Sequence, residues 1–82
     1  MVIVEYDSLF EKKIKKIKDN LFKLKVKKQI IKIIKFPKVG KPMRYSSKGT
    51  REIYIKPFRL SYIYLKDEDK IVFLDVYHKD EQ

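Results

Sequence analysis

The sequence contains no cysteine, a single histidine and no long run of apolar residues. Without cysteine the chain forms neither disulfides nor thiolate metal sites, and it is compatible with a reducing compartment. The longest apolar runs span only a few residues, far too few to cross a membrane, and the start "MVIVEYDS" lacks the features of a signal peptide. We therefore expect a cytoplasmic protein that makes no membrane contact.

Metal ligands are equally scarce. The acids gather mostly in the turn "KDEDK", and together with one histidine they do not supply three convergent ligands at a recognised spacing. We expect neither a metal nor a small-molecule cofactor.

Acidic residues are few relative to basic ones: 11 Asp and Glu against 21 Lys and Arg, a formal net charge of +10. This charge favours an anionic partner such as RNA, DNA, an acidic protein or an anionic membrane. Residues 12–35 alone hold eleven lysines and one acid, Asp19. They are either a solvated surface or a phosphate-binding flank whose affinity falls with salt.

The 82 residues, 44% of them apolar, are enough for one domain with one small core. "VIVEYD" predicts a first strand, and Ser8 with Glu11 has the spacing of a capping box that starts a helix. Its apolar stripe is Phe10, Ile14, Ile17 and Leu21. After a break at Asp19-Asn20, a second helix is expected from about 20 to 35, with the stripe Val26, Ile30, Ile33 and Ile34.

From residue 43 the apolar period changes to two, which is typical of strands. The predicted strands are "MRYS" (43–46), "REIYI" (51–55), "FRLSYIYL" (58–65) and "KIVFLDVYH" (70–78). The sequence thus predicts one α+β domain, residues 1–82, of order β-α-α-β-β-β-β. An N-terminal helical hairpin packs on one face of an antiparallel sheet, since tight loops join the last strands.

The helical hairpin is followed by "GKPMR", "TREIYIKPFRLSYIY" and "KIVFLDVYHKDE". In this order the segments resemble the RelE/ParE superfamily of type II toxin–antitoxin toxins over nearly the whole chain. The resemblance implies a RelE-like fold and a toxin that cleaves mRNA on the ribosome and so inhibits translation. It also implies a cognate antitoxin as a partner, besides the ribosome and mRNA.

In the RNA-cleaving branch, an arginine of the third strand, in a [YF]-R-L-x-Y context, stands over the scissile phosphate. The resemblance places Arg59 of "PFRLSY" there. Attack by a ribose 2′-hydroxyl builds charge on the phosphoryl oxygens, and a fixed guanidinium can donate paired hydrogen bonds to them. Alternation puts Phe58, Leu60, Tyr62 and Tyr64 on one sheet face and Arg59, Ser61 and Ile63 on the other. The alternative is that Arg59 only pairs with Glu52 or Asp75 on neighbouring strands.

The resemblance also points to the end of the last strand. His78 is similar in placement to the C-terminal histidine of YoeB-like members, where an imidazole moves protons. Lys79 resembles the second catalytic arginine of RelE. We expect Arg59 and His78 to share one basic hollow; the alternative for His78 is an exposed residue without a role.

RelE itself has two lysines on the second strand where this chain has Glu52 and Tyr54. We therefore consider Glu52 as the general base, or as a partner in a salt bridge with Arg51 or Arg59. Tyr54 would stack on a base or donate a proton. The remaining predicted contacts to RNA phosphates are Arg51, Arg44 and Lys48.

The main hypothesis from the sequence is thus a metal-independent endoribonuclease, an mRNA interferase. One alternative is a ParE-like inhibitor that binds DNA gyrase and has no nuclease activity, and another is a homologue that keeps the fold but has lost the activity.

Overall fold

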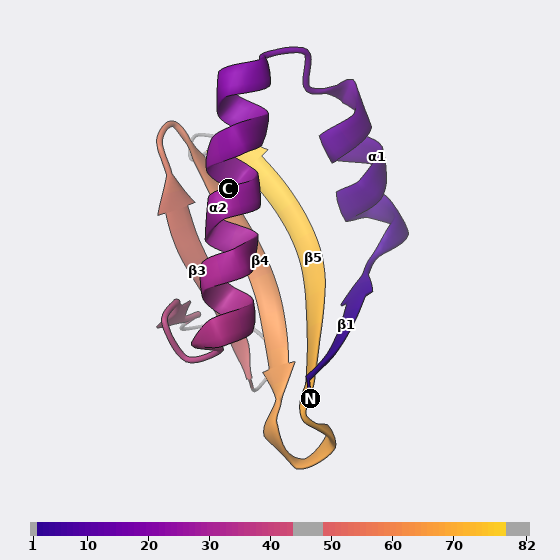
Figure 1. Ribbon diagram of the computed structural model, residues 1–82, viewed down its shortest axis with the longest axis vertical. Coiled ribbons are helices and arrows are strands. Elements are labelled where there is room, and N and C mark those ends of the chain that lie inside the picture. The colour runs from indigo at the N-terminus through magenta and orange to yellow at the C-terminus, as the bar shows by residue number, and fades with distance from the viewer. Residues whose placement is uncertain (1, 44–48, 79–82) are drawn as a thin grey trace.

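The computed structural model describes residues 2–43 and 49–78. Its sheet has the strand order β1-β5-β4-β3-β2. The strands are β1 (Ile3–Tyr6), β2 (Lys41–Pro42), β3 (Thr50–Ile55), β4 (Phe58–Leu65) and β5 (Lys70–His78). The helices α1 (Ser8–Lys16) and α2 (Asn20–Lys35) follow β1, and a short 3₁₀ helix, η1 (Lys66–Glu68), joins β4 to β5. The predicted α+β order is confirmed, and Figure 1 shows α2 lying across one face of the sheet.

Aspartates cap both helices. The Asp7 carboxylate accepts a hydrogen bond from the Leu9 backbone N–H at 2.9 Å, so the cap of α1 is Asp7 and not Ser8 as predicted. Asp19 accepts from the N–H groups of residues 21 and 22 at 2.9 and 3.3 Å. These caps satisfy backbone donors that the first helical turn leaves without a partner.

The cap at Asp19 confirms the predicted break between the helices, but the predicted apolar stripe of the hairpin is wrong at Leu21. Because α1 ends at Lys16 and α2 starts afresh at Asn20, the helical phase is reset between them. Phe22 is therefore the buried residue at the start of α2, and Leu21 is 72% exposed. Val26 and Ile33 are buried as predicted.

The sheet is mixed, whereas the sequence predicted an antiparallel one. Strands β2 to β5 are antiparallel neighbours, but β1 pairs in parallel with the first half of β5, from Ile3 opposite Lys70 to Tyr6 opposite Phe73. The meander leaves the outer edge of β5 open, and the N-terminal strand occupies it. The predicted strand 43–46 is also wrong at its start, because β2 ends at Pro42; residues 44–46 lie outside the described residues.

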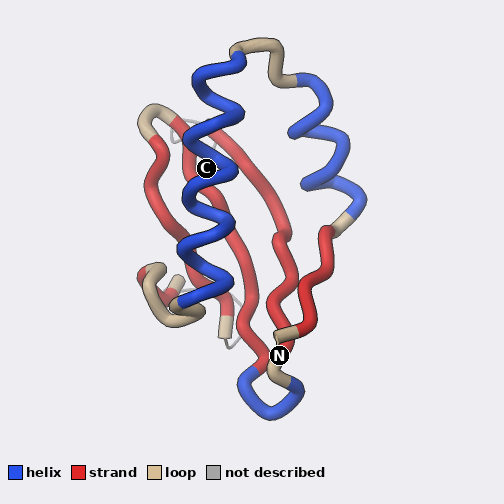
Figure 2. Tube along the Cα trace, in the orientation of Figure 1, coloured by secondary structure: helices blue, strands red, loops and turns tan. Residues whose placement is uncertain are grey.

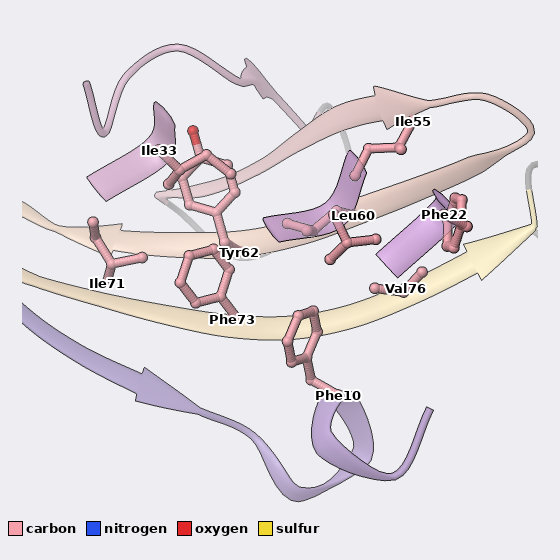
Figure 3. Packing of buried hydrophobic residues seen from close by; sticks show 10 residues of the cluster. Phe10, Phe22, Ile33, Ile55, Leu60, Tyr62, Ile71, Phe73 and Val76 are labelled. Carbon is pink, nitrogen blue, oxygen red and sulfur yellow. The ribbon is translucent and has the colours of Figure 1, made fainter. Parts of the chain in front are cut away.

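The core lies between the sheet and the helices. Its largest fully buried side chains are Tyr62, Phe73, Ile33, Leu60 and Ile71. Figure 3 shows Tyr62 and Phe73 from neighbouring strands packed together, with Phe10 of α1 reaching towards Phe73. Burying a side chain of this size contributes roughly 1.5–3 kcal/mol. The core therefore fixes the central strands on which the functional residues stand.

Candidate functional site

Strand register decides which side chains can act together. Directly opposite residues of an antiparallel pair project from the same sheet face. Arg59 lies opposite Tyr54 of β3 and opposite Tyr77 of β5, while Glu52 lies two residues from Tyr54 along β3, opposite Ser61. We call the side that carries Glu52, Tyr54, Arg59 and Tyr77 the Arg59 face. It is the side turned away from the core, because Leu60 and Tyr62 point to the helices.

Three polar side chains are bonded together on the Arg59 face. Arg59 Nη1 donates to Glu52 Oε1 at 3.0 Å, and the Tyr77 hydroxyl donates to Glu52 Oε2 at 2.9 Å. The side chains of Arg59 and Glu52 are 32% and 22% exposed. The alternative that Arg59 pairs with Glu52 is therefore realised. Asp75 instead lies 2.7 Å from Lys13 Nζ of α1.

His78 lies on the other face, so the predicted hollow shared by Arg59 and His78 is wrong. His78 is opposite Phe58, and the two rings meet edge to face with centroids 5.4 Å apart. Phe58 in turn contacts Phe22 of α2, at 4.9 Å between centroids. The residue that register places beside Arg59 is Tyr77, which the sequence reasoning missed.

A bulge in β5 is the reason why Tyr77, and not His78, lies beside Arg59. The hairpin register runs from Leu65 opposite Lys70 to Tyr62 opposite Phe73, but Ser61 then lies opposite Asp75, leaving Leu74 as the extra residue. Without the bulge, the same register would put position 78 on the Arg59 face. One inserted residue moves every later side chain to the opposite face. The apolar spacing 71, 73, 76 in the sequence is the signal that could have revealed it.

Arg51 lies on the helix side of the sheet, since it is opposite Tyr62. Its Nη1 donates to the carbonyl oxygens of Gly40 at 2.6 Å and Lys38 at 3.1 Å. The Tyr62 hydroxyl donates to Pro37 O at 2.7 Å and accepts from Gly40 N at 2.9 Å. Burial raises the pKa of Tyr62 above its ordinary value, while the hydrogen bond from Gly40 and the Arg51 charge lower it less.

Together these bonds form a latch, made by Arg51 and Tyr62, that fastens the loop between α2 and β2 to the sheet. Figure 2 shows this loop in tan beyond the C-terminal end of α2. The predicted contact of Arg51 with RNA phosphate is not tested by this arrangement. Of the other predicted residues, Tyr54 is on the Arg59 face and 51% exposed. Arg44, Lys48 and Lys79 lie outside the described residues.

Two hollows flank this arrangement. One, of about 450 Å³, is lined by Val39, Gly40, Lys41, Glu52, Ile53, Tyr54 and Arg59; we call it the Arg59 hollow. The other, of about 670 Å³, lies between the tip of the helical hairpin and the β3–β4 turn. Its apolar lining is Ile17, Leu21, Phe22, Leu24, Pro57 and Phe58, and its charged lining is Lys16, Lys18, Lys25, Lys28, Lys56 and Asp19. We call it the lysine-rimmed groove.

Residues 2–43 and 49–78 contain neither a metal-binding group of side chains nor a membrane-spanning helix. Histidine and acidic side chains nowhere gather in a group of three that could hold a metal ion. None of the helices there is long and apolar enough to cross a membrane.

Solved structures identify the class of fold. RelE of Escherichia coli in its complex with the antitoxin RelB has a TM-score of 0.81 at 14% identity, covering 95% of this chain and 96% of that one. The Mycobacterium tuberculosis RelBE2 complex gives 0.77 at 23% identity, covering 95% and 98%. The archaeal RelE–RelB complex of Pyrococcus horikoshii gives 0.79 at 8%, covering 99% and 98%. The fold is thus that of RelE toxins.

The sequence also identifies the family to which the chain belongs. Residues 4–82 match the sequence model of the ParE toxin of the type II toxin–antitoxin system parDE. The chain belongs to this family, and it is a toxin of a toxin–antitoxin system. A search among curated proteins finds no significant match.

Proposed function

We propose that this toxin cleaves messenger RNA on the ribosome by attack of a ribose 2′-hydroxyl on the adjacent phosphate. One observation carries the proposal: a guanidinium, a carboxylate and a phenol are joined on the Arg59 face by hydrogen bonds of 3.0 and 2.9 Å. These are the groups that the reaction uses for charge stabilisation, for the base and for the acid. Tyr77 takes the place that the sequence reasoning gave to His78.

The reaction balances with these three side chains. Glu52 accepts the proton of the 2′-hydroxyl, and the O2′ oxygen forms a bond to phosphorus while Arg59 donates hydrogen bonds to the non-bridging oxygens. The bond from phosphorus to the 5′-oxygen breaks, and Tyr77 gives that oxygen its proton. The products are a 2′,3′-cyclic phosphate and a free 5′-hydroxyl. The Glu52–Tyr77 hydrogen bond then lets the proton return to Tyr77.

Before RNA binds, the Arg59 guanidinium donates a hydrogen bond to the Glu52 carboxylate. A phosphate of the RNA must therefore displace this carboxylate from Arg59. Both side chains are partly exposed, and an ion pair in such a setting contributes only about 0.2–1 kcal/mol. The cost of opening the pair is therefore small. A phosphate on Arg59 would leave the Glu52 carboxylate free to accept a proton.

The lysines of the two helices support binding to ribosomal RNA. Residues 12–35, with eleven lysines and one acid, carry a net charge of +10, which equals the formal net charge of the chain. Contacts of this kind release counterions, so binding to ribosomes should weaken steeply as salt is raised.

The test uses ribosomes that translate a defined message. Cleavage should appear as new RNA ends carrying a 2′,3′-cyclic phosphate, and Arg59→Ala should lower the rate by roughly 10²-fold or more. Lys66→Gln removes one positive charge from the β4–β5 turn and is the matched control; it should cleave like wild type. Unchanged cleavage by a folded Arg59→Ala protein would refute the assigned role.

A second candidate is a ParE-like inhibitor that binds DNA gyrase without cutting nucleic acid. The match to the ParE family favours it, as does the neutralisation of Arg59 by Glu52. Inhibition of gyrase supercoiling by the purified protein, with no new RNA ends on ribosomes, would select this candidate over the nuclease.

We also propose an antitoxin partner that seats an acidic amphipathic segment in the lysine-rimmed groove. Leu21 and Leu24 in its lining are 72% and 54% exposed, so apolar surface is open to a partner. Five lysines surround it, and the one acid, Asp19, already caps α2. A second copy of the chain would bring lysines against lysines. Charge complementarity therefore favours apolar side chains flanked by Asp or Glu.

A further inference from the structure

The Arg59 hollow has a feature that the cleavage chemistry leaves unexplained. Arg59 and Glu52 occupy only part of its lining, and the rest extends over β3 to Lys41 of β2 and the preceding loop. Its volume of about 450 Å³ is within the range of small-molecule pockets, roughly 300–1,000 Å³. A phosphate held by Arg59 would therefore have room for one of its nucleosides beside it.

The lining has the chemistry to hold a base. Tyr54, directly opposite Arg59, has a half-exposed ring, and Val39 adds apolar surface. Aromatic rings beside a positively charged groove are the usual means of binding unpaired nucleotides, because every base offers a face for stacking. The hollow thus combines a stacking ring with cations.

The two cations stand on either side of β3. Lys41 is opposite Glu52 on the β2 side, and Arg59 is on β4. Two strand spacings across the sheet and two residues along it separate their backbones, about 12 Å in all. A nucleotide over β3 would thus have one cation near each of its flanking phosphates.

The latch gives this hollow a fixed wall. Tyr62 and Arg51 hold Gly40 through both its N–H and its carbonyl group. A Cβ at Gly40 would come within 2.7 Å of the Tyr62 hydroxyl and 2.8 Å of the Glu52 carbonyl oxygen, so the loop approaches the sheet this closely only with glycine. The wall is therefore formed before any ligand binds, which lowers the entropy cost of binding.

We propose that the Arg59 hollow is a subsite for one unpaired nucleotide of the RNA, with its base on Tyr54 and a flanking phosphate on Lys41. The proposal rests on the proposed function, since it assumes that Arg59 binds the scissile phosphate. It adds the substrate class: a nucleotide paired in an A-form helix cannot place its base in a hollow of this kind. The substrate must be single-stranded at this position.

The test uses a single-stranded trinucleotide with 2′-deoxyribose at the middle position, which cannot be cleaved there. Added to the labelled protein, it should shift the amide signals of residues 39–41 and 52–54. Tyr54→Ala should weaken its binding roughly 10-fold, as expected for the loss of one stacked base, and Tyr54→Phe should bind like wild type. Lys41→Gln should weaken binding several-fold, whereas Lys66→Gln, with the same loss of charge, should not.

The outcomes separate this proposal from the nuclease itself. Equal binding by wild type and Tyr54→Ala, or equal binding when the same three nucleotides are held paired in the stem of an RNA hairpin, would overturn the subsite. If the protein binds the trinucleotide in this way but produces no RNA ends on ribosomes, the subsite stands and the nuclease proposal falls. If the protein cleaves mRNA, and both Tyr54→Ala and Lys41→Gln cleave as fast as wild type, the nuclease proposal stands and the subsite falls.

Discussion

At the scale of single residues, two arginines of adjacent strands have different tasks because they point to different faces. Arg59 is bonded to a carboxylate on the face away from the helices. Arg51 donates to two backbone carbonyls of a loop. A guanidinium suits both, since it has five donors in a fixed plane. Its type alone does not reveal the task, and only the face on which it stands decides between them.

Tyr62 is the residue whose loss should weaken the latch. Tyr62→Phe keeps the ring in the core but leaves Pro37 O and Gly40 N without the hydroxyl. We expect a loss of about 1–3 kcal/mol in the free energy of unfolding, measured with urea near neutral pH. Tyr54→Phe, at a half-exposed ring, is the control and should unfold like wild type.

The Tyr62 hydroxyl also leads to a prediction about the stability of the protein at alkaline pH. Its pKa is raised in the folded protein, chiefly by burial, so the folded state keeps this proton after the unfolded chain has lost it. The unfolded chain loses it above about pH 10, and stability should fall from there upwards. The difference in unfolding free energy between wild type and Tyr62→Phe should therefore shrink at high pH. A difference independent of pH would contradict the assignment.

At the scale of elements, the sequence predicts most of the fold from local signals. The bounds of β4 and β5 are as predicted, and α2 spans the predicted residues, because apolar period and caps act within a few residues of each other. The parallel pairing of β1 with β5 joins segments far apart in the chain, and local patterns do not encode it.

The candidate site was predictable only in part. The Glu52–Arg59 pair was foreseen, as one of two alternatives, because both residues stand on strands of one tight hairpin. The bulge at Leu74 was not foreseen, and it places Tyr77 instead of His78 beside Arg59. The latch was also missed, since Tyr62 contacts residues 22 and 25 positions earlier in the chain.

Because of the bulge, we expect substitutions of the neighbouring residues Tyr77 and His78 to affect mRNA cleavage differently. Tyr77→Phe removes the proposed proton donor and should lower mRNA cleavage roughly 10²-fold. His78→Gln, one residue away on the helix side, should cleave within a few-fold of wild type once folding has been verified by circular dichroism. Strong loss in His78→Gln with normal activity in Tyr77→Phe would show that the original assignment to the histidine was right and the register argument wrong.

At the scale of the whole molecule, the lysine-rimmed groove and the Arg59 face are close neighbours through the sheet. Phe58 lines the groove and Arg59 follows it immediately on the opposite side. A segment seated in the groove does not itself cover Arg59. At about 3.3 Å per extended residue, however, a few further residues passing around the β3–β4 turn would reach it. One partner chain can thus use the groove for affinity and the Arg59 face for inhibition.

This arrangement predicts a toxin that escapes its antitoxin. Leu24→Asp replaces an apolar side chain of the groove by a charge that repels an acidic segment, and it leaves the Arg59 face intact. Burying a leucine contributes roughly 1.5–3 kcal/mol, so affinity should fall about 10- to 100-fold. Expressed together with its cognate antitoxin, this variant should still arrest growth. Leu9→Asp, at an exposed leucine of α1 outside the groove, should remain neutralised. Equal neutralisation of both variants would place the antitoxin elsewhere on the molecule.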